Sequence, residues 1–279
     1  MCFRNKIKVL SITLLLFSFI LSNVAIADSK PEGIKVPIIM YHQVKTCKTG
    51  KDVITPWEFE SDLKYLKENS YTTITMTDLI NYVDNAQDLP EKPIILSFDD
   101  GYYNNFVYVY PLLQKYNAKI VLSLIGTSTD KFSEVSDINI DYSHVTWDQI
   151  NEMIASGLVE VQNHTYNLHK VSYKRYGCKR NAGESLEQYE QVLVSDIEKL
   201  QEEITARTGT TPNTFNYPYG RYCDESEGII KKLGFKASLT CDYGVNKICR
   251  GNSNLFGLKR ICREHGTPIS KLLKSISKY

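Results

Sequence analysis

The sequence predicts an α/β fold in which about seven strand–helix units form a single barrel-like domain. Segments rich in apolar and β-branched residues alternate along the chain with segments of helical periodicity. The strand-like runs are almost continuously apolar, as expected when both faces of a parallel sheet are covered. About 245 residues follow the N-terminal segment, a length that suits one barrel better than two domains.

The expected strands are short, and most end in polar residues or glycine. They are residues 36–42, 93–99, 118–126, 158–164, 214–220, 236–240 and 256–264. In a barrel of parallel strands, the C-terminal strand ends share one face, where catalytic side chains gather. His42, Asp99, Asp100 and His164 fall at such ends, so we expect them to lie close together.

The expected helices carry recognisable start and stop residues. They are residues 55–69, 75–86, 104–117, 146–157, 185–209 and 226–235. Thr55 is an expected N-cap, and Pro56 follows it at the first helical position. Thr146 and Gln149 have the spacing of a capping box. These signals fix where the helices begin.

The N-terminus has the features of an export signal. Residues 1–27 contain basic residues near the start, then an apolar stretch, and no acidic residue. Ala25 and Ala27 form the small-x-small pattern of a cleavage site, which predicts cleavage before Asp28. The uncharged stretch is also long enough to remain as an N-terminal membrane anchor.

After this segment we expect a polar linker over 28–35 and one functional domain over 36–279. Either form of the N-terminus predicts a location outside the cytoplasm, secreted or anchored on the outer side of the cytoplasmic membrane. The net charge of +1 gives no electrostatic case for nucleic acid as a partner. The cysteines other than Cys2 are even in number, which permits disulfides in an exported chain, although free thiols are the alternative.

Two adjacent carboxylates, Asp99 and Asp100, directly follow a buried strand. Like charges at such a place repel one another unless a cation or a proton intervenes. Successive strand residues point to opposite faces, and Gly101 can break the strand so that both carboxylates face one site. The pair therefore indicates that one carboxylate binds a cation while the other acts as a base.

His164 and His169 are five residues apart, a spacing that does not fit one face of a helix. It suits a strand end followed by a turn that brings both imidazoles to one point. Together with a carboxylate they would form a set of two histidines and one carboxylate, which suits a catalytic Zn²⁺ or a related divalent ion. The alternative is a solvated pair of histidines in a polar loop.

The segments "SFDDG", "NHTYNLH" and "FNYPYG" resemble, in order, the first three motifs of the polysaccharide deacetylases, the NodB-like domain of carbohydrate esterase family 4. The resemblance covers about residues 36–265. "IIMYHQV" is similar to the branch that includes the poly-N-acetylglucosamine deacetylases, in which the catalytic histidine lies at the start of the domain. The resemblance implies a single-domain, distorted (β/α)7-type barrel.

The resemblance also implies roles for individual residues. It implies that Asp99 is the general base, that His42 is the general acid, and that the backbone N–H of Tyr219 stabilises the oxyanion. The implied metal ligands are Asp100, His164 and His169. The implied ion is divalent, with Zn²⁺ favoured over Co²⁺ or Ni²⁺. Aromatic residues near the motifs are candidates for stacking on sugar rings, with ordinary core packing as the alternative: Tyr166, Tyr217 and Tyr219.

The sequence departs from the family pattern in ways that affect the site. Asn216 occupies the position where the third motif usually has the arginine that orients the catalytic aspartate, and Arg260 at the end of the last strand is a hypothetical substitute. The longer histidine spacing fits the branch with the N-terminal histidine. His265 is a second candidate for the acid, but His42 is preferred. His144 is interpreted as a capping or surface residue.

The expected activity is metal-dependent removal of N-acetyl groups from N-acetylglucosamine residues of a cell-wall or extracellular polysaccharide, a hydrolysis that releases acetate. The alternatives are an O-acetyl esterase, a catalytically weak carbohydrate-binding protein of the same fold, and an iron-dependent oxygenase built on the same ligands. The basic stretch 170–185 is either a solvated loop or a rim that contacts an anionic glycan. The polymer itself is left open among peptidoglycan, poly-N-acetylglucosamine, chitin-like chains and xylan.

Overall fold

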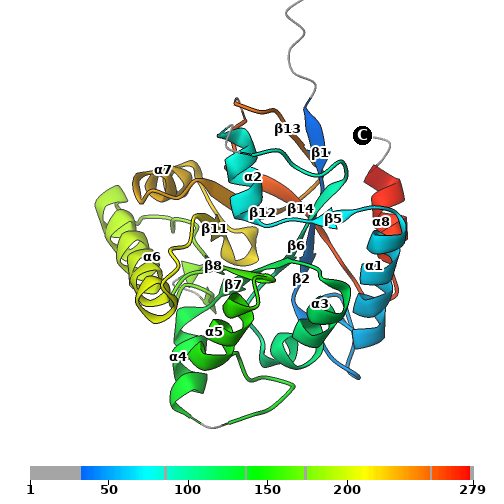
Figure 1. The fold of residues 1–279 in the computed structure, drawn as a ribbon. Helices are drawn as coiled ribbons and strands as arrows, with labels where there is room; N and C mark the ends of the chain where they lie inside the picture. Colours follow the sequence, from blue (N-terminus) through cyan, green and yellow to red (C-terminus); the bar gives the residue numbers. More distant parts are fainter. Residues whose placement is uncertain (1–32, 85–86, 136, 173–174, 252, 277–279) are drawn as a thin grey trace, which may run out of the picture. The chain divides into compact units, whose positions relative to one another are not determined.

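The computed structural model describes residues 33–84, 87–135, 137–172, 175–251 and 253–276. Parallel strands form a closed ring in the order β2-β14-β12-β11-β8-β7-β6, because β6 also pairs with β2 (Figure 1). The ring strands are β2 (Ile38–Tyr41), β6 (Pro93–Phe98), β7 (Ile120–Leu124), β8 (Val159–Asn163), β11 (Thr214–Asn216), β12 (Ala237–Tyr243) and β14 (Leu258–Cys262). The predicted (β/α)7-type barrel is therefore confirmed.

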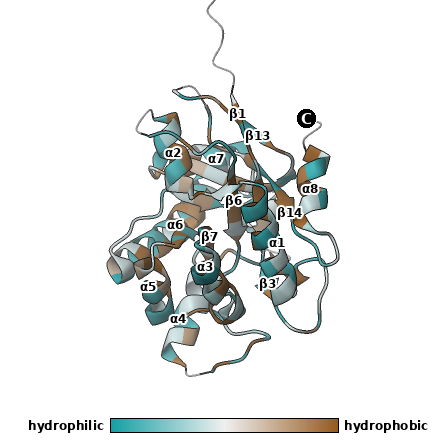
Figure 2. Ribbon diagram, turned by 45° about the vertical axis from the view of Figure 1, so that its right-hand side comes forward, coloured by the Kyte–Doolittle hydropathy of each residue, from teal (hydrophilic) through white to brown (hydrophobic). Residues whose placement is uncertain are grey.

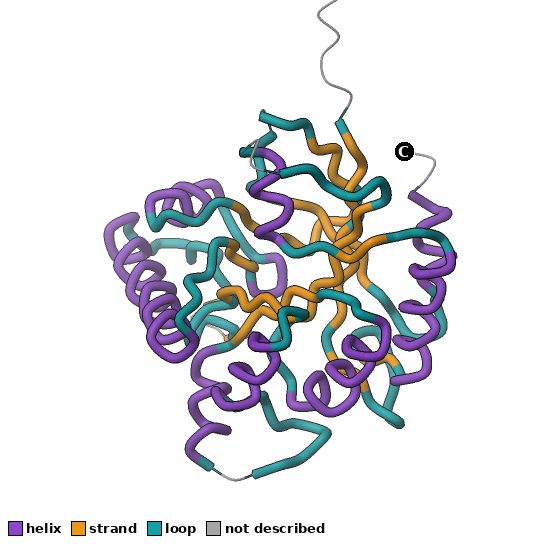
Figure 3. Tube along the Cα trace, in the orientation of Figure 1, coloured by secondary structure: helices purple, strands orange, loops and turns teal. Residues whose placement is uncertain are grey.

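The helices lie around the outside of the ring of strands (Figure 3). Those of the described chain are α1 (Pro56–Glu68), α2 (Met76–Val83), α3 (Tyr110–Tyr116), α4 (Gly126–Glu134), α5 (Trp147–Ala155), α6 (Leu186–Thr208), α7 (Asp224–Lys232) and α8 (Ile269–Ile276). A short π-helix (Asn105–Val109) precedes α3, and a 3-10 turn (Pro218–Gly220) follows β11. Most outer helices carry hydrophilic and hydrophobic residues together (Figure 2), as expected for helices that cover a sheet.

Short strands pair outside the ring or at its edge. They are β1 (Ile34–Val36), β3 (Gln43–Val44), β4 (Val53–Ile54), β5 (Thr72–Thr73), β9 (Val171–Ser172), β10 (Arg175–Tyr176) and β13 (Asn246–Ile248). β1 pairs with β13, so Ile34 and Lys35 belong to the folded domain rather than to the expected linker. The expected signal segment, 1–27, and residues 28–32 of that linker lie outside the described residues.

Capping residues fix the start of several helices as the sequence predicts. Thr55 accepts a hydrogen bond from the backbone of Glu58, whose side chain bonds back to Thr55, before α1. The same reciprocal arrangement joins Thr146 and Gln149 at the start of α5. Each box satisfies backbone N–H groups that would otherwise lack partners.

The sequence did not predict α4 or α8. α4 begins directly after β7 without a side-chain cap and has few apolar residues, so helical periodicity is weak there. Its first residue is Gly126, where a larger residue would clash because a Cβ atom would lie 2.4 Å from the ring of Tyr166. α8 follows the last strand and buries Ile269, Leu273 and Ile276 along one face.

An aromatic cluster supports the strand ends that carry polar residues. The rings of Tyr41 on β2 and Phe98 on β6 stack with centroids 4.8 Å apart. Phe59 of α1 meets both edge-on, at 5.5 and 5.4 Å. Because Tyr41 and Phe98 immediately precede His42 and Asp99, this packing fixes the backbone from which both side chains project.

Two further observations concern export. No helix within the described ranges is both long and apolar enough to cross a membrane. In the same part of the chain no disulfide joins Cys47, Cys178, Cys223, Cys241 and Cys262 to one another.

Candidate active site

The two adjacent carboxylates lie in a strained turn at the end of β6. Asp99 and Asp100 are 2% and 5% exposed. Asp100 itself has a left-handed backbone (φ 73°), as does Gly101 (φ 71°). The turn therefore begins one residue earlier than expected from Gly101 alone. A Cβ on Gly101 would also lie 2.8 Å from Leu124, so the position requires glycine. Strain of this kind persists where the surroundings fix the backbone.

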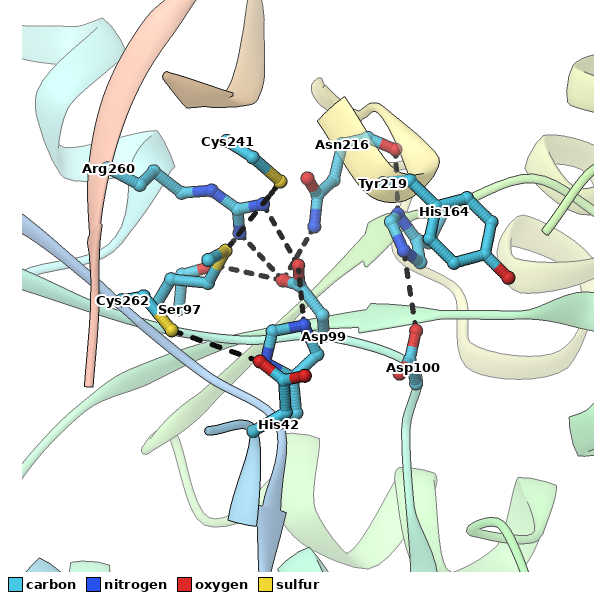
Figure 4. A network of polar contacts seen from close by, with 12 residues as sticks. His42, Ser97, Asp99, Asp100, His164, Asn216, Tyr219, Cys241, Arg260 and Cys262 are labelled. Carbon is cyan, nitrogen blue, oxygen red and sulfur yellow. Dashed lines mark hydrogen bonds and ion pairs between the residues drawn. The ribbon is translucent and has the colours of Figure 1, made fainter. Parts of the chain in front are cut away.

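Asp99 is held by side chains from two other strands (Figure 4). Arg260 donates from Nη1 to Oδ1 at 2.7 Å and from Nη2 to Oδ2 at 2.9 Å. Asn216 donates from Nδ2 to Oδ1 at 2.7 Å. Burial alone would raise the pKa of Asp99, but the charge of Arg260, aided by His42 and His164, outweighs it and lowers the pKa to about 2. Asp99 is therefore an oriented, ionised carboxylate at neutral pH.

His42 lies beside Asp99 at the end of β2. Its Nε2 atom is 3.8 Å from Asp99 Oδ2, and its Nδ1 atom is 4.0 Å from Asp52 Oδ1. Asn105 donates a hydrogen bond to the backbone oxygen of His42 at 2.9 Å, which holds this stretch of chain in place. An imidazole and a carboxylate thus face each other at the strand ends.

Asp100, His164 and His169 converge on one point. One ligand atom from each lies within 4.8 Å of the others. Both Nε2 atoms face Asp100 Oδ1, at 3.4 Å from His164 and 3.1 Å from His169. Oδ1 is nevertheless buried without a hydrogen-bond partner in the described structure.

The Nδ1 atoms of His164 and His169, on the other side of each ring, both have polar partners. His164 Nδ1 lies 2.7 Å from the backbone oxygen of Asn216, which can only accept, so Nδ1 donates. His169 Nδ1 lies 3.1 Å from the hydroxyl of Tyr219. Each contact orients its ring so that Nε2 points at Asp100, as outer partners of metal-binding histidines do.

The loop between the histidines is fixed by Asp196 of α6. Its two carboxylate oxygens accept from the backbone N–H groups of Tyr166 and Asn167, both at 2.8 Å. Thr165 adopts a left-handed backbone (φ 73°) directly after His164. This turn reverses the chain within the five-residue spacing and brings His169 back beside His164.

The cluster fits a divalent cation. A buried, unpartnered carboxylate oxygen faces two imidazole nitrogens whose rings are oriented from behind. Two histidines and one carboxylate leave coordination positions open for water and substrate. Among the described residues this is the one group of ligating side chains with such geometry.

Two of the aromatic residues proposed to bind substrate are engaged elsewhere. Tyr217 is fully buried, with its ring 5.0 Å from both Phe215 and Tyr222, so the prediction that it contacts a sugar is wrong. The residue after β11 turns inward to fill the core instead. Tyr166 donates its hydroxyl to Asp130 at 3.0 Å, and Lys199 lies over its ring at 3.5 Å from the centroid. These contacts leave little of Tyr166 for a sugar.

His265 packs against the start of α1, where its Nδ1 atom is 2.8 Å from Glu58 Oε2.

His144 packs between the rings of Tyr102 and Phe132, with ring centroids at 4.7 and 5.6 Å. Burial lowers the pKa of His144 to about 4, so it is a neutral packing residue rather than the capping or surface residue expected.

Two arginines of the basic stretch that follows His169 form ion pairs. Arg175 binds Glu184, and Arg180 lies 2.8 Å from Glu225. Arg180 thereby connects the stretch to α7, whereas Lys170 and Lys179 are exposed.

Sequence reasoning missed several contributors to the site. Asn216 makes two contacts: its side chain donates a hydrogen bond to Asp99, and its backbone oxygen accepts one from His164. The hydroxyl of Tyr219 supports His169, and Asp52 faces His42. One feature of the sequence pointed to these contacts: asparagine stands where the third motif usually has arginine. This feature predicted Arg260 as the partner of Asp99, but it did not predict the hydrogen bonds of Asn216.

Comparisons with known proteins agree with this geometry. A family model described as polysaccharide deacetylase matches residues 86–238. The poly-β-1,6-N-acetyl-D-glucosamine N-deacetylase of Escherichia coli (strain K12) is 29% identical over 209 residues, which cover 65% of this chain and 30% of that protein. The protein of the same name from Staphylococcus aureus (strain N315) is 27% identical over 204 residues, 73% of this chain and 65% of that protein. The chain thus spans less than two thirds of either relative.

Solved structures are similar over most of the chain. A de-N-acetylase from Aggregatibacter actinomycetemcomitans has a TM-score of 0.73 at 25% identity, over 86% of this chain and 99% of that one. IcaB from Ammonifex degensii has a TM-score of 0.67 at 25% identity, over 82% and 92%. The Streptococcus pyogenes deacetylase PplD in complex with acetate has a TM-score of 0.70 at 21% identity, over 88% and 99%, which is a likeness of fold.

Proposed function

The chain belongs to the polysaccharide deacetylase family, and we propose that it hydrolyses N-acetyl groups on N-acetylglucosamine residues of a cell-wall or extracellular polysaccharide, releasing acetate. The different surroundings of two adjacent carboxylates carry this proposal. Asp99 is ionised and held by Arg260, whereas Asp100 turns an unpartnered oxygen toward two imidazoles. The first is suited to accepting a proton and the second to binding a cation.

Asp100, His164 and His169 would hold the divalent ion, with Zn²⁺ favoured over Co²⁺ or Ni²⁺. When bound there, such an ion lowers the pKa of water and polarises the acetyl carbonyl. The backbone partners of the loop and the hydroxyl of Tyr219 keep the two imidazoles aimed at this point.

Asp99 then takes the proton of the attacking water, whose oxygen bonds to the acetyl carbon. Arg260 and Asn216 keep the accepting carboxylate oriented throughout. The backbone N–H of Tyr219 donates to the developing oxyanion. His42 gives its proton to the sugar nitrogen as the C–N bond breaks, so that acetate and a free amine leave.

The names of relatives support an N-acetylglucosamine polymer as substrate, since two of them are poly-β-1,6-N-acetyl-D-glucosamine N-deacetylases. His42 favours an amide over an O-acetyl ester, because a departing amine needs a proton more than a departing alcohol does. An extracellular setting is part of the proposal and is supported by the export pattern of residues 1–27.

Acetate release from N-acetylglucosamine oligomers tests the proposal. The purified protein is assayed after chelation and again after Zn²⁺, Co²⁺ or Ni²⁺ is restored. We expect release to stop on chelation and to return with metal. A folded protein that binds the oligomers but releases nothing with any metal would instead be a carbohydrate-binding protein. Release only from O-acetylated xylan would make it an esterase.

A further inference from the structure

A strip of aromatic side chains runs outward from the metal-binding cluster. The ring of Tyr219 lies 4.2 Å from that of His169, centroid to centroid. Tyr176, on β10, lies 5.5 Å further along. The guanidinium of Arg221 stacks on Tyr176 at 4.6 Å from the ring centroid. A turn after β11 and a hairpin after β8 therefore build one continuous surface.

This surface remains exposed although it lies beside a buried site. Tyr219 is 39% exposed and Tyr176 is 37% exposed. A large aromatic side chain left in water contributes less to folding than a buried one does. Adjacent exposed aromatic rings next to a catalytic cluster are typical of a surface that binds a ligand.

The strip is held rigidly. Gly177 lies so close to the neighbouring turn that a Cβ atom would be 2.8 Å from the backbone oxygen of Pro218. Cys178 donates from its backbone to the oxygen of Arg221 at 3.1 Å. Arg175 on β10 pairs with Glu184, and Arg180 pairs with Glu225 of α7. A surface that is ordered before binding loses little conformational entropy when a ligand arrives.

Arg221 differs from the other arginines of this region. Arg175 and Arg180 each bind a glutamate, whereas Arg221 has no carboxylate partner in the described part of the chain. Because its guanidinium stacks on Tyr176, its N–H groups remain available at the edge of the ring. Such a group can donate hydrogen bonds to the hydroxyls of a sugar that lies against the aromatic face.

We propose that Tyr176 and Arg221 form a second sugar-binding subsite, which holds the pyranose next to the one that is deacetylated. The C–H face of that sugar packs on Tyr176, and its hydroxyls accept hydrogen bonds from Arg221. The inference rests on the proposed function, since it places the reacting sugar at the metal cluster. It predicts that a longer glycan is a better substrate because it fills this subsite.

The test compares kcat/KM for N-acetylglucosamine oligomers of increasing length, from the dimer to the pentamer. In the unaltered protein, kcat/KM should rise as sugars are added. In Tyr176→Ala and Arg221→Ala, this rise in kcat/KM should be about tenfold smaller, the equivalent of about 1.4 kcal/mol. The effect should appear in KM, with kcat and metal content unchanged. Tyr176→Phe should keep the gain, because it keeps the ring. Tyr243→Ala is the control, since Tyr243 is also exposed but its hydroxyl contacts Ser275 of α8.

The outcomes separate this inference from the proposed function. If the unaltered protein releases no acetate from any oligomer, the proposed function fails. If the unaltered protein is active and its kcat/KM rises with oligomer length, but kcat/KM of Tyr176→Ala rises equally, the proposed subsite does not exist. Arg221→Lys distinguishes a stacked guanidinium from a simple positive charge. We expect Arg221→Lys to behave as Arg221→Ala does, and full recovery in the lysine variant would overturn the stacked subsite.

Discussion

Arg260, on the last strand of the barrel, binds both carboxylate oxygens of Asp99, directly after β6, at 2.7 and 2.9 Å. Two parallel N–H···O bonds of this kind fix the plane of a carboxylate as well as its charge. Asn216 adds a third bond from β11. The orientation of the proposed base thus depends on three strands that lie far apart in the sequence.

Replacing Arg260 should therefore impair catalysis more than its charge alone would suggest. Arg260→Lys keeps a positive charge but cannot make both bonds, so Asp99 loses its fixed orientation. We expect kcat for acetate release to fall by about 100-fold, the equivalent of about 2.7 kcal/mol in the activation barrier. Metal content, measured by elemental analysis, should stay unchanged.

Arg263→Lys is the matched control for that variant. Arg263 is also almost fully buried and binds the carboxylate of Asp62 through Nε at 2.6 Å. Its replacement should lower the melting temperature while leaving kcat near that of the unaltered protein. An equal loss of kcat in both variants would mean that general destabilisation, not orientation of Asp99, explains the result.

The two adjacent carboxylates should respond differently to substitution. Asp100→Ala removes the oxygen that faces both imidazoles, so metal and activity should be lost together. Asp99→Asn should retain metal and lose activity, because an amide cannot accept the proton of water. Metal analysis and acetate release on the same samples check both statements. A fully active Asp99→Asn would show that the roles are assigned wrongly.

The hydroxyl of Tyr219 should affect metal affinity. Tyr219→Phe removes the contact with His169 Nδ1 and frees that ring to turn. We expect metal binding to weaken by about tenfold, the lower end of the effect of losing an outer partner. Competition with a chelator measures this. Tyr222→Phe is the control, because the hydroxyl of Tyr222 contacts Asp242 instead. Equal affinity in both variants would argue against support of His169 by Tyr219.

The two candidate acids can be compared directly. His42→Ala should lower kcat by about 100-fold, within the usual range for a general acid. His265→Ala should leave kcat unchanged and slightly lower the melting temperature, because His265 contacts Glu58 at the start of α1. Acetate release by both variants decides the assignment, and the reverse result would move the acid to His265.

Acid should destabilise the fold partly through Asp99. Its pKa is lowered from 3.8 to about 2 in the folded protein, so its contribution is complete above about pH 4 and is lost as pH falls toward 2. In urea unfolding of the metal-free protein, about 1 kcal/mol of stability should disappear from this group between pH 5 and pH 3. Asp99→Asn should not lose this part of its unfolding free energy between pH 5 and pH 3. The same pH dependence of stability in Asp99→Asn and in the unaltered protein would contradict the prediction.

The sequence predicted those site residues that lie at the ends of recognisable strands. Asp99, Asp100, His164 and His42 lie at or just after the ends of expected strands, and parallel strands bring such positions together. The same reasoning led to Arg260. The barrel itself followed from the alternation of strands and helices, because each strand needs both faces covered.

What escaped prediction depends on contacts rather than on patterns. Tyr217 lies beside a catalytic motif in sequence, yet its ring fills the core. The backbone oxygen of Asn216 and the carboxylate of Asp196 act through positions that no periodicity marks. α4 has too few apolar residues to stand out as a helix. The left-handed backbone of Asp100 is not marked by the sequence, because most aspartates adopt negative φ.

The pairing of β14 with β2, through Ile261 and Ile39, closes the barrel with the strand that carries Arg260. A chain released before residue 260 would contain every proposed metal ligand and His42, but its sheet would be open and its base unoriented. The proposed base is therefore oriented only when β14 has docked beside β2. The oriented carboxylate is thus a property of the closed barrel and not of the strand end that carries it.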